Sequence, residues 1–401
     1  MRPASGNASP TFFQRFVHSE VGGSVVLLVC SVSALVWANS PWADSYFALV
    51  RTYVGLSWAG ATFEMSLQHW VNDGLMVLFF FVVGLEVKRE VSVGELSSFD
   101  QAALPASAAL GGMAIPALLY AAFNLGGDGV DGWGIPMATD IAFALGVLAL
   151  FGKRVPLGLK VFLTALAIVD DIGAVLVIAL FYTEQISWVA LLVAGGLLAL
   201  LRVAARARRY RIYVLAPLAL GVWIAVLASG VHATVAGILV ALVVPVRARL
   251  DPTELLERSR GRLGEVESQA LSRESMLRER RQLEAIEDLH GAVVKMRPAG
   301  LTLEAALHPI QAFFVLPLFA LFNAGVALGD GFAARAVDPI ALGIVVGLVV
   351  GKPIGWRAVG VVGVLAGVVG ARRRVVDQGV ERGDQIVVVG IGVDVGDRPQ
   401  T

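Results

Sequence analysis

The chain has 401 residues, of which 57% are hydrophobic and only 16% are charged, and its mean hydropathy is +0.74. This composition lies outside the range of soluble domains and indicates a polytopic membrane protein. The 32 basic and 32 acidic residues balance, so net charge points to no partner class, and we find no nucleic-acid-binding pattern. The single cysteine, Cys30, excludes a disulfide framework and a cysteine-based metal site.

Ten apolar runs, give or take one, have the length expected of membrane-spanning helices. In chain order they are residues 22–38, 70–87, 103–123, 135–151, 157–181, 188–201, 212–228, 232–246, 307–328 and 339–350, the last extending at most to residue 370. Residues 1–21 lack the features of a signal peptide and are predicted to be a short cytoplasmic lead. The first eight runs are predicted to fill residues 22–246, and the ninth and tenth to fill residues 301–356.

Positive charge is distributed unevenly between alternate loops. With a cytoplasmic N-terminus, the inner loops carry Lys88, Arg89, Lys153, Arg154, Arg202, Arg206, Arg208, Arg209 and Arg211. The outer loops carry only Arg51 and Arg335. Because cytoplasmic loops are enriched in Lys and Arg, this asymmetry predicts that the N-terminus is cytoplasmic.

Two segments in the C-terminal half of the chain differ in composition from the apolar runs. Residues 247–300 are predicted to be a charged cytoplasmic insert, with 11 basic and 10 acidic residues between 247 and 297. A weak coiled coil, a helical hairpin and a solvated loop all fit its pattern. Residues 357–401 are predicted to be a divergent tail, because 23 of the last 44 residues are Val or Gly. A shifted reading frame in a GC-rich gene is one hypothesis for this tail.

Asp170 and Asp171 stand side by side within the fifth apolar run. Ionisable residues are costly in a spanning segment, so carboxylates there predict a functional site. Neighbours on a helix point roughly 100° apart, so one carboxylate can face a cavity while the other faces a partner helix. Two such groups titrate as a coupled unit that can exchange protons for a cation. A satisfied polar network or a water pocket is the structural alternative.

Two further features place polar chemistry inside apolar runs. Pro136 precedes Thr139 and Asp140 in the fourth run, and a proline-broken helix exposes backbone carbonyls. Carbonyl, hydroxyl and carboxylate oxygens suit a small hard cation, although a simple proline kink gives the same pattern. Lys352 lies within the tenth run and must pair, reach the interface or lose its proton. One of the central aspartates is its simplest partner.

A third group of titratable residues lies near the predicted cytoplasmic ends of the runs. Its members are Glu86, Lys88, Arg89, Glu90, Glu304 and His308. Glu and His together can sense pH near neutrality, although ordinary helix-end charges explain the same residues. No nucleotide-binding, metal-ligand or nucleophile motif is found, so we expect no enzyme activity and no cofactor, and ion movement driven by existing gradients.

Several long motifs resemble the bacterial NhaA sodium/proton antiporters. They are GGSVVLLVCSVSALVWANS, WVNDGLMVLFFFVVGLEVKREV, GIPMATDIAFALGVLALFGKRVPLGLKVFLTALAIVDDIGA, SGVHATVAG, LPLFALFNAGV and VGKPIG. The resemblance runs from about residue 22 to 355 and implies an all-α inverted-repeat antiporter fold with broken helices, of which this family is a known example. The family has twelve helices, of which about ten are recognisable here.

The resemblance also implies roles for individual residues. Asp171 would be the principal sodium or lithium ligand, and Asp170 the second carboxylate, paired with Lys352 when no cation is bound. Thr139 and Asp140 would lie at the broken fourth helix. Glu86, Lys88, Arg89, Glu90, Glu304 and His308 match the family's cytoplasmic pH-sensing region. An electrogenic, pH-regulated exchanger of sodium or lithium for protons is expected, as a homodimer in the lipid of the bacterial inner membrane.

Three alternatives differ from this expectation in testable ways. An antiporter corrupted at its C-terminal end would be inactive. An intramembrane aspartyl protease needs two carboxylates from different helices, whereas Asp170 and Asp171 are adjacent on one. A passive cation channel would conduct without dependence on a pH gradient.

Overall fold

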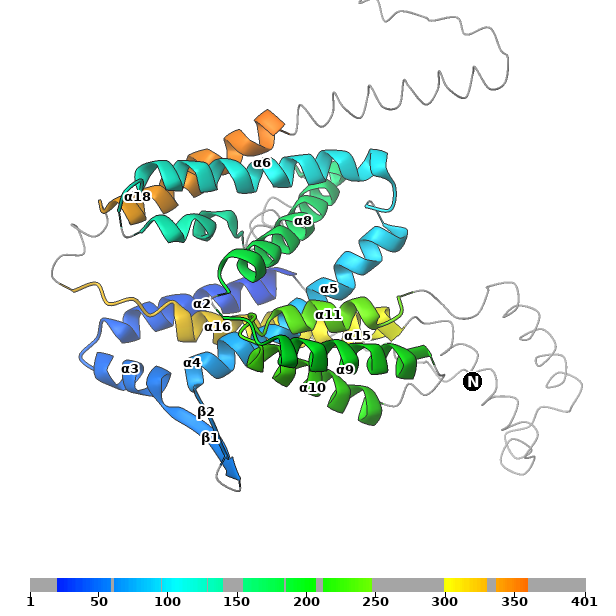
Figure 1. The fold of residues 1–401 in the computed structure, drawn as a ribbon. Helices are drawn as coiled ribbons and strands as arrows, with labels where there is room; N and C mark the ends of the chain where they lie inside the picture. Colours follow the sequence, from blue (N-terminus) through cyan, green and yellow to red (C-terminus); the bar gives the residue numbers. More distant parts are fainter. Residues whose placement is uncertain are drawn as a thin grey trace, which may run out of the picture.

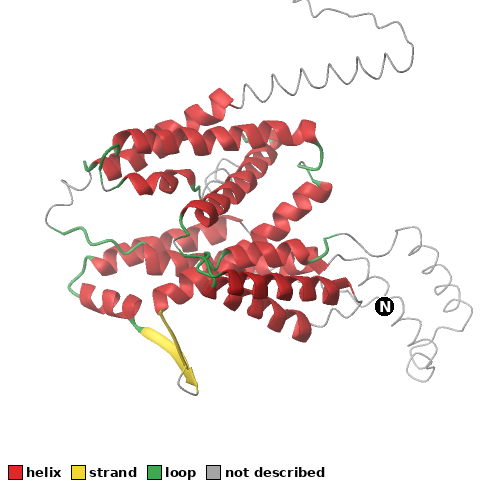
Figure 2. Cartoon of the chain, viewed as in Figure 1, coloured by secondary structure: helices red, strands yellow, loops and turns green. Residues whose placement is uncertain are grey.

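The computed structural model describes most of the apolar runs. The described residues are 20–58, 61–94, 96–127, 129–139, 154–183, 185–206, 212–246, 299–329 and 337–359. Asp140, most of the predicted lead and insert, and the tail from residue 360 lie outside them. The regular secondary structure of the described part is helical apart from one two-stranded sheet, as Figure 2 shows. The predicted fold class, an all-α polytopic membrane protein, is therefore confirmed.

The chain begins with a bent pair of helices and a hairpin. α2 spans Glu20–Ala38 and α3 spans Ala43–Arg51, with an angle of 114° between their axes. β1 (Tyr53–Trp58) and β2 (Ala61–Ser66) then pair antiparallel. This hairpin, which extends away from the helices in Figure 1, was not predicted from the sequence.

Three long spans each contain a π-helical segment. The first consists of α4 (Leu67–His69), η1 (Trp70–Leu75) and α5 (Met76–Val93). The second consists of α15 (Ala299–Ile310), η4 (Gln311–Val315) and α16 (Leu316–Asn323). The third consists of α18 (Pro339–Val346) and η5 (Gly347–Gly351), and it continues as helix to Val359. π-Helical turns are rare and frequently mark functional sites.

The remaining elements lie between the first and second of these spans. They are α6 (Phe99–Phe123), the 3₁₀ helix η2 (Val130–Met137), α8 (Leu157–Phe181), α9 (Trp188–Arg206), α10 (Ile212–Ala228) and α11 (Val235–Val243). Within the described residues, six helices are long and apolar enough to span a membrane, or seven if α2 and α3 form one broken span. The number of spanning helices in the whole chain, ten in the sequence analysis, stays a prediction.

Helix boundaries agree with the sequence in some places and not in others. α8 and α10 begin and end at the predicted residues. The ninth run, predicted at 307–328, is instead helical from Ala299 to Asn323. Beyond it, the Asn39 side chain donates to Val326 O at 2.8 Å and accepts from Leu328 N at 2.6 Å. After Asn323, the backbone thus bonds to the side chain of Asn39, which follows α2, and no longer in a helical pattern. Hydropathy alone cannot indicate that the helix ends here.

The helices form two packed groups, visible as upper and lower sets in Figure 1. In one group, α6 packs against α8, η2 and α18. In the other, α5 packs against α11, α9 against α10, and α2 against α16. α5 contacts α8 and joins the groups, with Val83, Val87 and Ile168 in a shared buried cluster.

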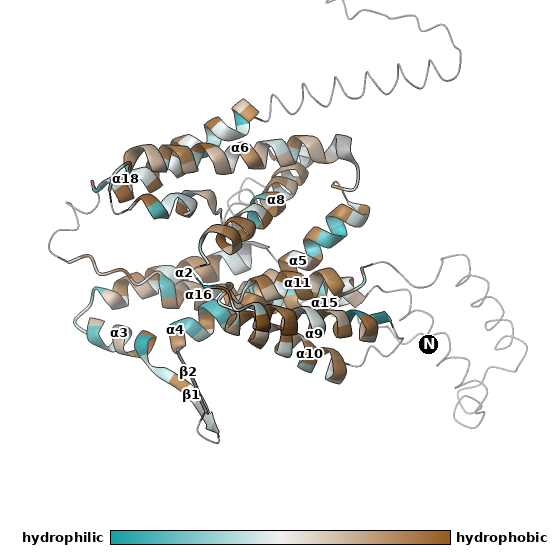
Figure 3. Cartoon of the chain, viewed as in Figure 1, coloured by the Kyte–Doolittle hydropathy of each residue, from teal (hydrophilic) through white to brown (hydrophobic). Residues whose placement is uncertain are grey.

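Apolar residues predominate along these helices, as the hydropathy colouring in Figure 3 shows, and many of their side chains are exposed. Leu192 is 77% exposed and Val349 is 67% exposed. Exposed apolar faces of this extent are expected where lipid, rather than water, surrounds the helices.

Candidate functional site

The aspartate pair lies near the middle of α8. Asp170 is buried, with only 3% of its surface exposed, while Asp171 is partly buried. α8 begins after Pro156, whose fixed backbone suits the position before a helix, and continues through an apolar run to Phe181. The helix therefore carries two adjacent carboxylates far from either of its ends.

Lys352 reaches Asp170 from a different span. It follows the π-helical segment η5 directly, and only 3% of its surface is exposed. The helix that carries it lies very close to α6, because Gly111 and Gly355 leave no space for a side chain between the two backbones. The Lys352 ammonium lies 2.8 Å from Asp170 Oδ2, so the two form a buried ion pair.

The broken fourth run supplies the remaining partners of Lys352. η2 ends at Met137, because Ala138 is extended, and Thr139 follows before the end of this described stretch. Lys352 Nζ donates to Met137 O at 2.7 Å and to Thr139 Oγ1. An ammonium has three donor hydrogens, and these two acceptors together with Asp170 account for all of them.

Thr139 also links the broken run to α8. Its hydroxyl donates to Asp170 Oδ2 at 2.6 Å, so this carboxylate oxygen accepts from both Thr139 and Lys352. The other oxygen, Asp170 Oδ1, is buried and has no hydrogen-bond partner among the described residues. A buried carboxylate oxygen with spare acceptor capacity can serve as a ligand for a cation or accept a proton.

The structure therefore brings together Asp170, Thr139 and Lys352, three residues singled out from the sequence. Asp171 lies beside them on α8, and Asp140 lies outside the described residues. The carbonyl of Met137 is a partner of Lys352 that was not predicted. Every residue has a backbone carbonyl, and Pro136 indicates only that the helix breaks near this point.

The predicted pH-sensing residues divide into two sets of contacts. Arg89, on α5, forms ion pairs with Glu304, on α15, and with Glu90 at 3.1 Å, and it lies 3.8 Å from Glu86. His308 is one helical turn after Glu304, on the same face of α15. The ion pair between Arg89 and Glu304 thus connects the ends of the two spans.

Lys88 makes different contacts from the other members of this group. Its ammonium donates to Leu242 O at 2.7 Å and to Val244 O. Both carbonyls belong to the C-terminal end of α11, where helical carbonyls have no intrahelical partner. Lys88 therefore caps α11, a role the sequence analysis did not predict.

Comparison with known proteins identifies the chain's relatives. The family model described as Na+/H+ antiporter 1 matches residues 14–395, which includes most of the segment interpreted as a divergent tail. The chain is 46% identical to the Na(+)/H(+) antiporter NhaA of Oleidesulfovibrio alaskensis over 85% of its length and 76% of that protein. It is 45% identical to the Na(+)/H(+) antiporter NhaA 1 of Saccharophagus degradans over 87% of its length and 76% of that protein.

A third relative, the Na(+)/H(+) antiporter NhaA of Wolinella succinogenes, is 43% identical over 88% of this chain and 78% of its own length. These matches agree with the resemblance read from the motifs, and they do not favour the corrupted antiporter, the protease or the channel. The apolar spans, the buried ion pair between them and the matching family model lead to one conclusion: the chain is a multi-pass membrane protein that belongs to the Na+/H+ antiporter family.

Proposed function

We propose that this protein exchanges cytoplasmic sodium or lithium for external protons at one shared site. Asp171 and Asp170 are the carboxylates for which the two ions compete. Thr139 and Asp140, at the broken fourth run, complete the surroundings of the site, and Lys352 pairs with Asp170 when no cation is bound. Membership of the sodium/proton antiporter family supports the exchange itself.

The observation that carries the proposal is the buried contact between Asp170 and Lys352 beside a second carboxylate. Removing a buried charge from its partner is costly, so this pair is expected to persist until another cation offers an equivalent interaction. A sodium ion next to Asp170 and Asp171 offers one. Binding of the cation and release of Lys352 are therefore expected to be coupled.

The charges of the site also support an electrogenic exchange. With both carboxylates ionised, Lys352 charged and one sodium bound, the site is neutral. A proton on Asp170 opens the pair with Lys352 as sodium does, so with both carboxylates protonated and no sodium the same site carries one positive charge. Exchange of two protons for one sodium would therefore move net charge across the membrane, and a membrane potential would drive it.

The cluster around Arg89 is the proposed pH-sensing region. The guanidinium of Arg89 lies near three carboxylates, those of Glu86, Glu90 and Glu304. His308 lies one helical turn after Glu304, and the ion pair between Arg89 and Glu304 joins α5 to α15. Protonation of a carboxylate here would weaken an ion pair that holds two spans together. The packing of these spans would then depend on cytoplasmic pH.

The proposed setting is the bacterial inner membrane, with the N-terminus in the cytoplasm and two copies of the chain forming a homodimer. The unequal distribution of basic residues between loops supports this orientation. The exposed apolar faces support immersion in lipid.

The experiment is sodium-induced collapse of a preset pH gradient in everted membrane vesicles that contain the 401-residue chain. Sodium, and in a parallel series lithium, should dissipate the gradient in the wild-type protein. Asp171→Asn should abolish the response. Asp338→Asn is the matched control, because Asp338 caps α18 outside the site and asparagine caps a helix equally well.

Two outcomes would contradict the proposal. Exchange that survives Asp171→Asn would remove this carboxylate from the site. A wild-type rate that does not respond to an imposed membrane potential would exclude an electrogenic exchange. Repeating the measurement over a series of pH values tests the proposed regulation separately.

A further inference from the structure

η2, the 3₁₀ helix that leads to Thr139, is held by two tyrosine hydroxyls from neighbouring helices. We propose that Tyr182, at the end of α8, is a positioning residue that fixes Thr139 relative to Asp170 and so sets the affinity of the site for sodium. This inference rests on the proposed function, because it assumes that sodium binds beside Asp170 and Thr139.

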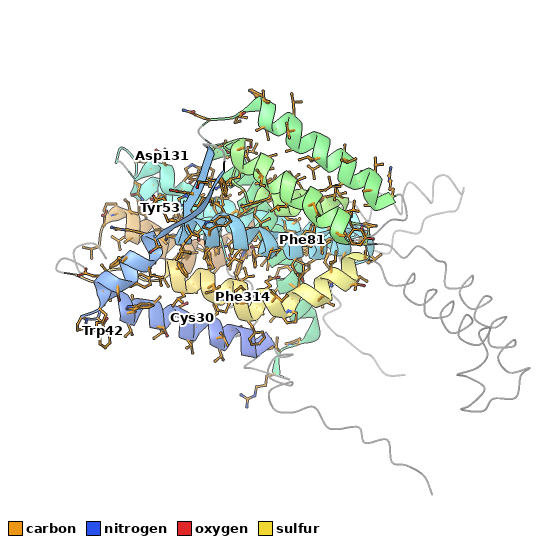
Figure 4. All side chains as sticks on the ribbon, turned by 90° about the horizontal axis from the view of Figure 1, so that it is seen from below. Cys30, Trp42, Tyr53, Phe81, Asp131 and Phe314 are labelled. Atoms are coloured by element: carbon orange, nitrogen blue, oxygen red, sulfur yellow. The ribbon has the colours of Figure 1, made fainter. Side chains whose placement is uncertain are left out.

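The Tyr182 hydroxyl makes two hydrogen bonds with the backbone of η2. It donates to Asp131 O at 2.6 Å and accepts from Gly134 N at 2.9 Å. Asp131, labelled in Figure 4, lies near the beginning of η2. A 3₁₀ helix joins the carbonyl of one residue to the amide three residues later, and Asp131 and Gly134 are such a pair. The hydroxyl therefore binds both ends of one helical turn.

The same two segments are joined again at the site itself. α8 carries both Tyr182 and Asp170, which are twelve residues apart and therefore separated by about 18 Å along the helix. The other segment carries Asp131 and Thr139, eight residues apart and about 16 Å at the rise of a 3₁₀ helix. Because Tyr182 bonds to Asp131 and Asp170 bonds to Thr139, the two segments run antiparallel and are fixed at both ends.

The sequence of η2 is suited to these contacts. A Cβ atom on Gly134 would lie 2.8 Å from the Tyr182 hydroxyl oxygen, so glycine leaves the hydroxyl room to approach the backbone. The neighbouring Trp133 packs edge-on against Phe181, with ring centroids 5.2 Å apart, and 6.1 Å from the ring of Tyr182. The end of α8 thus holds η2 through both polar and aromatic contacts.

Tyr120, from α6, holds the other side of the same element. Its side chain is buried, and its hydroxyl donates to Gly129 O at 2.8 Å, immediately before η2 begins. A Cβ atom on Gly132 would collide with this hydroxyl. α6 and α8 therefore each hold the beginning of η2 through a tyrosine hydroxyl. Lys352 and Asp170 hold the other end, through Met137 O and Thr139.

Loss of the Tyr182 hydroxyl should act on the site through this element. The carbonyl of Asp131 and the amide of Gly134 would then lose their link to α8, and η2 could shift along that helix. Functional groups in a binding site have to be held within about 0.5 Å of their working positions. A shift of this size at Thr139 would weaken sodium binding while leaving both carboxylates in place.

Tyr182→Phe is the test, because it removes only the hydroxyl. In everted vesicles we expect the apparent KM for sodium to rise about three- to tenfold, the loss expected for one or two hydrogen bonds. Vmax, normalised to the amount of protein in the membrane, should stay within about twofold of the wild type, because the ligands themselves remain.

Tyr46→Phe is the matched control. The Tyr46 hydroxyl also bridges a carbonyl and an amide, donating to Leu321 O at 2.9 Å and accepting from Gly325 N at 3.2 Å, but it joins α3 to the end of α16. Both variants should lower the thermal midpoint of the purified protein. Only Tyr182→Phe should raise the KM for sodium, which separates positioning from general stability.

Failure of this inference can be distinguished from failure of the proposed function. If Asp171→Asn is inactive and Tyr182→Phe has the wild-type KM, or if Tyr46→Phe raises KM equally, the positioning role of Tyr182 is wrong. If Asp171→Asn remains active, the proposed function itself fails. Should Tyr182→Phe not reach the membrane, Tyr120→Phe decides by the same criterion, because Tyr120 holds the same element through one bond.

Discussion

Asp170 and Lys352 form an ion pair whose contribution to stability can be separated from its role in transport. Both side chains are almost fully buried, and their charged atoms lie 2.8 Å apart. Lys352→Met would leave the Asp170 carboxylate buried without its cation, which typically costs about 3–5 kcal/mol. Asp170→Asn should cost less, because an amide oxygen can still accept from Lys352 and a hydrogen bond to a charged group contributes about 1.5–3 kcal/mol.

The double variant Asp170→Asn/Lys352→Met should recover much of this loss. Removing both charges also removes the cost of burying them. Replacement of a buried ion pair by well-packed hydrophobic residues of similar volume is often neutral or stabilising by about 1–4 kcal/mol, and Asn and Met keep the volumes of Asp and Lys approximately. We therefore expect the double variant to unfold close to the wild type, and well above Lys352→Met. The two substitutions should be strongly non-additive, as expected for residues in direct contact.

The assay is thermal unfolding of the purified protein in detergent without sodium, followed by intrinsic tryptophan fluorescence at one fixed scan rate. The order of the midpoints is the measured quantity, because unfolding of large proteins is often irreversible. Asp338→Asn, which keeps the cap of α18, serves as the control for an aspartate change elsewhere. Additive losses in the double variant would refute the reasoning, since they would mean that the two charges do not stabilise each other.

Three further predictions concern contacts away from this pair. Asn323→Ala should lower the thermal midpoint, because Asn323 Nδ2 donates to Asn72 Oδ1 at 2.8 Å and Asn323 Oδ1 accepts from Asn72 Nδ2 at 3.2 Å. Adding Asn72→Ala should cost little more, because the first substitution already removes both bonds. A double-mutant cycle measures this, and independent losses would contradict it. Lys88→Met should lower the stability of the folded protein by about 1–2 kcal/mol, because α11 loses its cap. The pH profile of exchange in vesicles should stay unchanged, and a shifted profile would mean that Lys88 takes part in pH sensing. Glu304→Gln should shift the pH of half-maximal exchange, because Arg89 loses a charged partner; an unmoved profile would exclude this ion pair from regulation.

Much of the site could be predicted because the relevant signals are local in the sequence. Asp170 and Asp171 interrupt an apolar run, and a carboxylate in such a run is costly wherever the helix packs. Lys352 stands out in the same way, and its partner could be guessed because few opposite charges are available inside the membrane. Thr139 was singled out because it follows a proline inside an apolar run, and the residues around Arg89 because several titratable groups gather near the ends of runs.

Contacts made by the backbone or by ordinary residues could not be predicted. The carbonyls of Met137 and Leu242 accept from Lys352 and Lys88, yet carbonyls carry no residue-specific signal. Tyr182 looks like any aromatic residue at a helix end, and its two bonds to η2 appear only once α8 and η2 lie side by side. The end of α16 at Asn323 likewise depends on Asn39, which is far away in the sequence.

The sequence by itself determined that this is a helical membrane protein, where most of the apolar spans lie and which charges inside them need partners. These properties depend on the hydropathy of neighbouring residues and on the cost of charge in lipid. Only the tertiary structure decided that Lys352 satisfies all three of its donors at one point, that Lys88 caps another helix and that a hairpin follows α3. Those features depend on segments that are distant in the chain, and hydrogen bonds of this kind form only after the helices have packed.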